Sequence, residues 1–169
     1  MVAGSDNAKA TITTAMTGGD AHNVPKVQNA SHTLIMCTRT TIDDTHLTAV
    51  LHAEKDAGRF ASDEIMQSRQ ALCSHYISQY ATQPELLLQW AENQTFIALG
   101  HLLLSAKLLG IDATPIGGYD AAALDQALDL PAKGLKSSVL VALGYASDAD
   151  GNRTLPKARL AMDQLVTWL

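Results

Sequence analysis

The stretch ALGHLLLSAKLLGIDATPIGGYD, residues 98–120, decides the fold of this chain of 169 residues. It closes a long helical segment that starts at the capping sequence Thr82-Gln-Pro-Glu85 and ends at Gly110. At 1.5 Å per residue, such a helix is roughly 40 Å long. Its first half is amphipathic, but from Phe96 onward it is apolar almost all round, which predicts a helix buried on every side.

Two apolar runs without polar alternation predict buried strands on either side of this helix in the sequence. The first is the run 34–37 within residues 31–40, and the second is 139–143. Two strands are too few to cover a buried helix, so we expect further strands in residues 1–3 and 164–169. Because the chain starts within a strand, we expect a domain that is truncated at its amino end.

Two shorter helices are predicted between the first strand and the long helix. One starts at the capping sequence Thr41-Ile-Asp-Asp44 and ends at Gly58. The other starts at Ser62 and carries an apolar stripe that includes Tyr76. No repeat or linker divides the chain, which predicts a single domain over residues 1–169.

Composition excludes several classes of function. Twelve Lys and Arg against 17 Asp and Glu give a net charge of −5, without a basic cluster, which argues against nucleic-acid and membrane partners. The longest uncharged apolar stretch, residues 93–106, is shorter than the about 20 residues that a bilayer requires. With two cysteines and no signal peptide, we expect free thiols and a soluble cytoplasmic protein.

The sequence contains no motif in which side chains alone would catalyse a reaction. The six histidines form no i, i+4 pair and no Cys/His cluster, so no metal site is predicted. Walker, G-x-S-x-G and G-x-G-x-x-G sequences are also missing. If the chain is an enzyme, a cofactor therefore carries the chemistry.

Three segments remain as candidate cofactor contacts. Asn23 and Lys26 share a helix face, although on these residues alone an N-cap and a solvated lysine are the commoner explanation. The segment 113–120 contains two consecutive glycines that allow the backbone to approach a flat ligand, or simply form a turn. Lys157 and Arg159 are two apart, so an extended chain points both toward one phosphate, or toward solvent.

The order of these segments resembles the FMN-dependent nitroreductase superfamily, in particular the oxygen-insensitive NAD(P)H nitroreductases and dihydropteridine reductases. The shared stretches are N-x-x-K, ASH and an apolar strand (23–37), DAGRF (56–60), the passage 98–120 and LPKARL (155–160). The resemblance implies an α+β fold: a three-layer α-β-α sandwich with a mixed, mostly antiparallel sheet and a long buried central helix. It also implies a homodimer in which each carboxyl-terminal strand joins the partner's sheet.

The resemblance assigns roles to individual residues. The flavin would carry the reaction, with no catalytic side chain and no metal. Gly117 stands where close relatives often carry an acidic residue, and the phosphate anchor and Gln-Pro-Trp segment that open family members are lacking. The implied FMN contacts are Asn23, Lys26, Pro115, Ile116, Gly117, Gly118, Lys157, Ala158 and Arg159; the implied NAD(P)H contacts are Lys26 and Arg59, and the substrate contact is Tyr76.

The function implied by the resemblance is two-electron transfer from NAD(P)H through FMN to nitroaromatics, quinones or pteridines, with ping-pong kinetics. The alternatives are a catalytically silent, truncated nitroreductase scaffold and a small-molecule binding module on the same fold. For the truncated chain we expect weak FMN binding and slow turnover, because half of the phosphate anchor is lacking.

Overall fold

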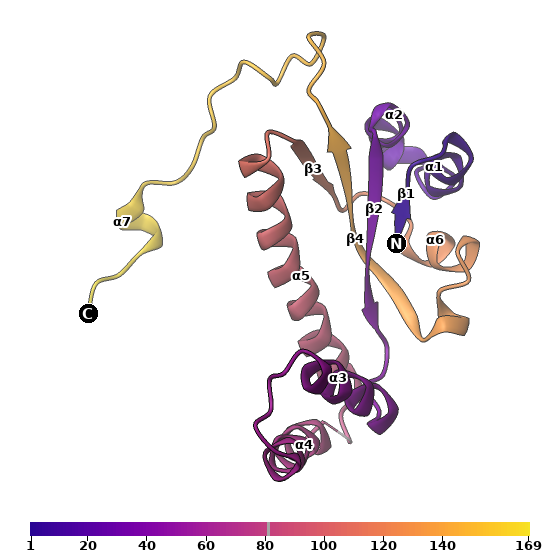
Figure 1. The fold of residues 1–169 in the computed structure, drawn as a ribbon. Coiled ribbons are helices and arrows are strands. Elements are labelled where there is room, and N and C mark those ends of the chain that lie inside the picture. The colour runs from indigo at the N-terminus through magenta and orange to yellow at the C-terminus, as the bar shows by residue number, and fades with distance from the viewer. Residues whose placement is uncertain (81) are drawn as a thin grey trace.

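Four antiparallel strands form the centre of the fold, which a computed structural model describes for residues 1–80 and 82–169 (Figure 1). The strands are β1 (Val2–Ala3), β2 (His32–Arg39), β3 (Asp112–Ile116) and β4 (Leu135–Gly144), and they lie in the order β1-β2-β4-β3. Helices cover both faces of the sheet. The predicted α+β, three-layer architecture is confirmed. The predicted sheet is mixed and mostly antiparallel, whereas all three strand pairs among the described residues are antiparallel.

The central pair β2–β4 contains the two predicted apolar runs. Leu34 pairs with Val141, and Ile35 pairs with Leu140, while the register shifts between Met36 and Cys37. The predicted strand at the amino end is also present, because β1 pairs with the start of β2. Val139, Leu140, Val141 and Ala142 are all buried, as expected for a strand with a helical layer on each face.

Strand β3 corrects the interpretation of residues 113–120 as a simple turn. Asp112–Ile116 pairs with β4 along its whole length, with Asp112 opposite Gly144 and Ile116 opposite Leu140. The strand is short and contains Pro115, so the hydrophobic pattern of the sequence does not reveal it. Because β3 lies at the edge of the sheet, proline is tolerated there, since its lack of an N–H donor need not break a hydrogen bond to a neighbouring strand.

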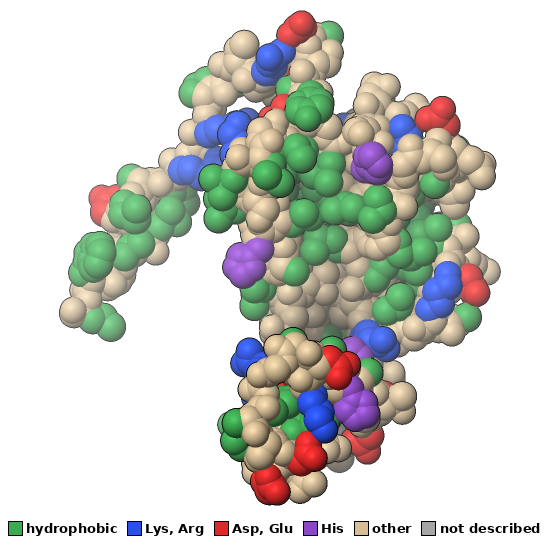
Figure 2. Space-filling view, viewed as in Figure 1, with side chains coloured by type: hydrophobic (Ala, Val, Ile, Leu, Met, Phe, Trp, Pro, Cys, Tyr) green, Lys and Arg blue, Asp and Glu red, His purple; other side chains and the backbone are tan. Residues whose placement is uncertain are grey.

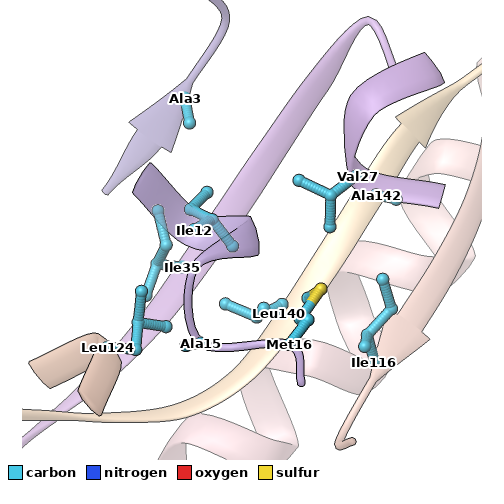
Figure 3. Packing of buried hydrophobic residues seen from close by; sticks show 10 residues of the cluster. All are labelled: Ala3, Ile12, Ala15, Met16, Val27, Ile35, Ile116, Leu124, Leu140 and Ala142. Atoms are coloured by element: carbon cyan, nitrogen blue, oxygen red, sulfur yellow. The ribbon is translucent and has the colours of Figure 1, made fainter. Parts of the chain in front are cut away.

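One face of the sheet carries the main core (Figure 3). Helices α1 (Asp6–Thr13), α2 (Val24–Asn29) and α6 (Ala121–Ala127), with the 3-10 helix η1 (Gly18–Asn23), pack here. The cluster consists of Ala3, Ile12, Ala15, Met16, Val27, Ile35, Ile116, Leu124, Leu140 and Ala142.

A buried lysine belongs to this layer. Lys9 is buried, and its Nζ donates to the carbonyl oxygens of Gln28 and Ala30, both at 3.0 Å. A cation at the carboxyl end of α2 satisfies carbonyls that the helix leaves unpaired. Lys9 therefore fastens α1 to the end of α2.

The other face of the sheet is covered by α5 (Pro84–Leu108), which ends as predicted, with Gly110 at φ 73°. Only Ala91, Leu99 and Ala106 of this helix are buried, and Leu99 packs on Val139 and Val141. The prediction of a helix buried on every side is therefore wrong for a single chain. Its outer side leaves apolar side chains exposed, among them Trp90, Phe96, Ile97, Leu104 and Leu108.

Helices α3 (Asp44–Asp56) and α4 (Asp63–Ser78) pack on each other at the lower end of the sheet (Figure 1). Ser62 caps α4 as predicted, and Gly58 follows α3 with φ 76°. The start of α3 differs from the prediction, because Asp43, not Thr41, is the capping residue. No residue of α4 is buried, whereas α3 buries Leu47 and Leu51.

The carboxyl-terminal segment leads away from the layers (Figure 1). After η2 (Pro131–Lys133) and β4, the chain contains only the single turn α7 (Met162–Leu165), and residues 145–169 are nearly all exposed. The strand expected at 164–169 is not formed in the single chain, because no unpaired strand edge lies beside it. Among the described residues, no helix combines the length and apolar character needed to cross a bilayer.

Candidate functional site

Asn23 connects the amino-terminal helices to the loop after β3. Its Nδ2 donates to the carbonyl oxygen of Gly118 at 3.0 Å, and its Oδ1 accepts from Lys26 Nζ at 2.7 Å. The side chain is 4% exposed and forms no capping hydrogen bond with α2, although Asn23 is the N-cap residue. Asn23 therefore occupies the predicted N-cap position without a capping hydrogen bond, and its amide instead joins Gly118 to Lys26.

The two consecutive glycines have different surroundings. A Cβ on Gly118 would lie 2.6 Å from Asp20 Oδ1 and 2.8 Å from Asn23 Nδ2, whereas one on Gly117 would meet nothing within 4 Å. Gly118 is thus held against η1, while Gly117 presents exposed backbone. Such a backbone accepts a flat ligand at close range.

The loop that carries these glycines is fixed at both ends. Ile116 is 2% exposed within the core, whereas Pro115 beside it on β3 is exposed. Beyond the glycines, the Asp120 N–H donates to the Ala15 carbonyl oxygen at 2.8 Å, and Asp120 Oδ1 caps α6 through the Ala123 N–H. A loop fixed in this way presents the Gly117 backbone in one conformation.

Asp20 was not identified from the sequence, yet its carboxylate lies against Gly118. The available signal was the spacing of Asp20, Asn23 and Lys26, because polar residues three apart in a helical segment lie on one side. Asp20 is half-buried in η1. The cluster therefore has a carboxylate and an ammonium group, each three residues from a central amide.

The predicted phosphate contacts lie apart from this cluster. Lys157, Ala158 and Arg159 belong to the exposed carboxyl-terminal segment, and Arg159 Nη1 donates to the neighbouring Ala158 carbonyl at 2.6 Å. The segment leads away from the layers, so a single chain does not bring these residues to Asn23 and Gly118 (Figure 1).

Arg59 and Tyr76 lie at the α3–α4 end of the molecule, also apart from the loop after β3 (Figure 1). Arg59 Nε is 3.4 Å from Glu54 Oε1, and the arginine side chain is mostly exposed. Tyr76 projects from α4 and is 57% exposed. In one chain, neither residue joins the Asn23 cluster.

Tyr76 lines a cavity of about 530 Å³ between α3, α4, α5 and β2. Its wall is mostly apolar and includes Tyr80, Trp90 and Leu47, with Cys37 and Thr38 contributed by β2. Burial raises the pKa of the Cys37 thiol, so this group stays protonated near neutral pH and is a poor nucleophile. The cavity offers space for a small, mostly apolar molecule, with His46, Arg69 and Cys73 as further polar or nucleophilic groups in its wall.

Comparison with known proteins identifies the class. Residues 20–145 match the nitroreductase family, and this span contains the Asn23 cluster and both glycines. The oxygen-insensitive NAD(P)H nitroreductase of Enterobacter cloacae is 34% identical over 99% of this chain and 77% of its own length. Its counterpart from Salmonella typhimurium is 32% identical over the same shares. The chain belongs to the nitroreductase family, which makes it an oxidoreductase.

Solved structures agree with this fold. A protein from Exiguobacterium sibiricum, solved in complex with FMN, aligns with a TM-score of 0.79 at 19% identity, over all of this chain and 75% of the other. An enone reductase of gut-bacterial fatty acid saturation aligns with a TM-score of 0.76 at 20% identity, again over all of this chain and 75% of the other. At these identities the likeness shows the architecture alone.

Proposed function

We propose that this chain binds FMN and transfers two electrons from NAD(P)H to small acceptors such as nitroaromatics, quinones or pteridines. The observation that carries the proposal is the cluster of Asn23, Lys26 and Gly118 beside the open backbone of Gly117. We propose further that residues 1–169 act as one domain. Relatives with NAD(P)H nitroreductase activity in their names, and a neighbour of the same fold solved with FMN, support the cofactor.

The residues of the cluster suit one edge of a flavin. An amide and an ammonium group next to each other match the polar pyrimidine edge, and exposed glycine backbone suits the flat ring. Bound FMN supplies the ability to accept a hydride and to pass two electrons onward. Lys26 would stabilise the negative charge that reduction brings, and Asn23 would keep Lys26 in place. Pro115 and Ile116 would position the loop.

The phosphate would be held by Lys157, Ala158 and Arg159 of the carboxyl-terminal segment. Two cations two residues apart suit charge-assisted hydrogen bonds to a phosphate. Since one chain leaves this segment away from Asn23, we propose a homodimer in which the segment packs on the partner. The exposed apolar side of α5 and the exposed Leu165 and Trp168 support this arrangement, since burying them is favourable.

The proposed kinetics are ping-pong, because one flavin serves donor and acceptor in turn at the same face. Arg59 and Lys26 would bind the nicotinamide nucleotide, and Tyr76 would contact the acceptor. In the proposed dimer, Arg59 and Tyr76 would reach the site of the partner, since they lie far from the cluster of their own chain (Figure 1).

A second candidate is a catalytically silent scaffold or a small-molecule binding module. The separation of Lys157 and Arg159 from Asn23 favours the silent scaffold, and the cavity beside Tyr76 favours the binding module. Flavin content distinguishes these candidates from the leading proposal.

The test is to purify the protein, release any ligand by heat and identify it by mass spectrometry. FMN at near one equivalent per chain, with NADH or NADPH oxidation that depends on a nitroaromatic acceptor, is the expected result. Release of FAD alone contradicts the choice of cofactor. A colourless protein that takes up no added FMN contradicts the proposal as a whole.

A further inference from the structure

One carboxylate beside the Gly117–Gly118 loop has no role in the site as described above. Asp20 lies on η1 and is half-buried, with Oδ1 2.6 Å from the position that a Cβ of Gly118 would take. Its backbone N–H donates to the Thr17 carbonyl oxygen at 3.0 Å. Within residues 1–80 and 82–169, its carboxylate belongs to no ion pair and accepts no hydrogen bond.

We infer that Asp20 determines the charge preference of the site, which favours cationic acceptors over anionic ones. The inference rests on the proposed function, because it places the acceptor near the open backbone of Gly117. Consecutive Cα atoms are about 3.8 Å apart, so a molecule at Gly117 lies within roughly 8 Å of the Asp20 carboxylate. At that range an incompletely solvated charge changes the binding energy of a charged ligand without direct contact.

The charge of Lys26 opposes that of Asp20, and the two are separated by Asn23. Lys26 Nζ is bound to Asn23 Oδ1, on the side of the amide that does not contact Gly118. The carboxylate lies against Gly118 itself. The glycine loop therefore lies next to the negative group, and removal of that charge leaves the positive charge of Lys26 unopposed within the Asn23 cluster.

The expected size follows from Coulomb's law. Removal of a unit charge about 7 Å from a charged ligand changes the Kd of that ligand about threefold to eightfold, if the effective dielectric constant lies between about 40 and 80. Screening by salt reduces the effect, since the Debye length falls to about 3 Å at 1 M. The difference in Kd between cation and anion, and the disappearance of this difference at high salt, are thus two separate measurements of the effect.

The experiment uses FMN-loaded, oxidised protein without an electron donor, so that binding is measured in the absence of turnover. Calorimetry yields the Kd of three ligands of similar shape, 4-nitrobenzylammonium, 4-nitrobenzyl alcohol and 4-nitrobenzoate. In Asp20→Asn we expect the Kd of the cation to rise about threefold to eightfold and that of the anion to fall similarly. The Kd of the alcohol should stay unchanged, and 1 M NaCl should remove the differences.

Asp44→Asn is the matched control, because it makes the same charge change at an exposed position on α3. It should leave all three Kd values unchanged. Asp20→Ser removes the charge with a smaller side chain and should repeat the result if the amide variant does not fold. If the Kd of the cation and the Kd of the anion are each the same in Asp20→Asn as in the parent protein, the inference is overturned. Failure of the parent protein to load FMN or to oxidise NAD(P)H overturns the proposed function on which the inference rests.

Discussion

At the scale of single residues, the site depends on an amide that joins segments 95 positions apart in the sequence. Asn23 Nδ2 binds the Gly118 carbonyl oxygen, and Asn23 is almost completely buried. A buried amide that loses its partner costs about 1–3 kcal/mol, so the contact both stabilises the fold and shapes the site. The glycines beside it provide a matched pair of variants.

Gly118→Ala should lower the free energy of unfolding by about 1–3 kcal/mol, because the new Cβ displaces Asp20 or Asn23. Gly117→Ala should change it by less than about 0.5 kcal/mol, since that position is open. Urea unfolding of both variants measures the difference, and FMN affinity should fall more in Gly118→Ala. Equal stability of the two variants would show that the methyl group added at Gly118 does not disturb the hydrogen bond between Asn23 and Gly118.

At the scale of elements, polar contacts fix α5 on the sheet. Thr38 Oγ1 lies 2.8 Å from both Thr95 Oγ1 and Ser138 Oγ, and Lys136 Nζ lies 2.9 Å from Glu92 Oε1. These contacts lie between β2, β4 and the inner side of the helix. Apolar packing, such as that of Leu99, is not directional and would allow the helix to shift along the sheet. The paired hydroxyls and charges are directional and define one position of α5 relative to the strands.

The Glu92–Lys136 pair predicts a pH dependence. Burial disfavours the charged carboxylate, but the Lys136 and Ser138 partners outweigh it and hold the pKa of Glu92 below its ordinary value near 4.5. A lowered pKa in the folded state contributes stability above the ordinary pKa, and this contribution is lost as the pH falls through the lower, folded value. Acid therefore weakens the attachment of α5.

Glu92→Gln should thus be less stable than the parent protein at pH 7, by a few tenths to about 1 kcal/mol. The difference should shrink as the pH falls below about 4.5. Unfolding measured in urea at pH 7 and at pH 3.5 checks this. A difference that stays constant with pH would mean that packing of the side chain, not its charge, matters.

The carboxyl-terminal segment provides the second prediction at this scale. If Lys157 and Arg159 hold the phosphate, Lys157→Ala with Arg159→Ala should raise the FMN Kd roughly 10²- to 10⁴-fold, since each charge-assisted hydrogen bond is worth about 1.5–3 kcal/mol. Both residues are exposed in the single chain, so folding should be little affected. Arg153→Ala, in the same segment and paired with Asp148, is the control. Unchanged FMN affinity in the double variant would assign the phosphate to other residues.

At the scale of the whole molecule, exposed apolar surface dominates one side. Hydrophobic side chains gather over the α5 side and along the carboxyl-terminal segment (Figure 2). They include Phe96, Ile97 and Leu104 on the helix and Leu165 and Trp168 in the segment. Large apolar side chains exposed in this number indicate an interaction site, which in the proposed dimer is covered by a second copy.

Ile97→Glu with Leu104→Glu should convert the proposed dimer to a monomer, because two carboxylates cannot be buried unpaired in an apolar interface. Both side chains are exposed in the single chain, so secondary structure should be retained. Sedimentation equilibrium of the parent and the variant decides the point, with Glu85→Gln on the same helix as a control. A parent protein that is monomeric at micromolar concentration would contradict the proposed homodimer.

The sequence alone determined the two central strands, the carboxyl end of the long helix and the glycine loop, because each depends on local features. The predicted capping box at the start of the long helix is not formed, since Gln83 is the N-cap residue and makes no side-chain capping bond. Continuous apolar runs specify buried strands, and Gly110 ends α5 by its own conformational freedom. The family resemblance also followed from ordered motifs, and residues 20–145 confirm it.

Tertiary structure decided what local pattern leaves open. Strand β3 depends on pairing with β4 and overrides a sequence that contains proline. The exposed side of α5 depends on which neighbours the helix finds, and hydropathy alone does not distinguish a core helix from one that packs on a partner. Asp20 became part of the site only when the fold placed it on Gly118. The spacing of Asp20, Asn23 and Lys26 indicates a shared side of one segment, but not a contact with a residue 98 positions away.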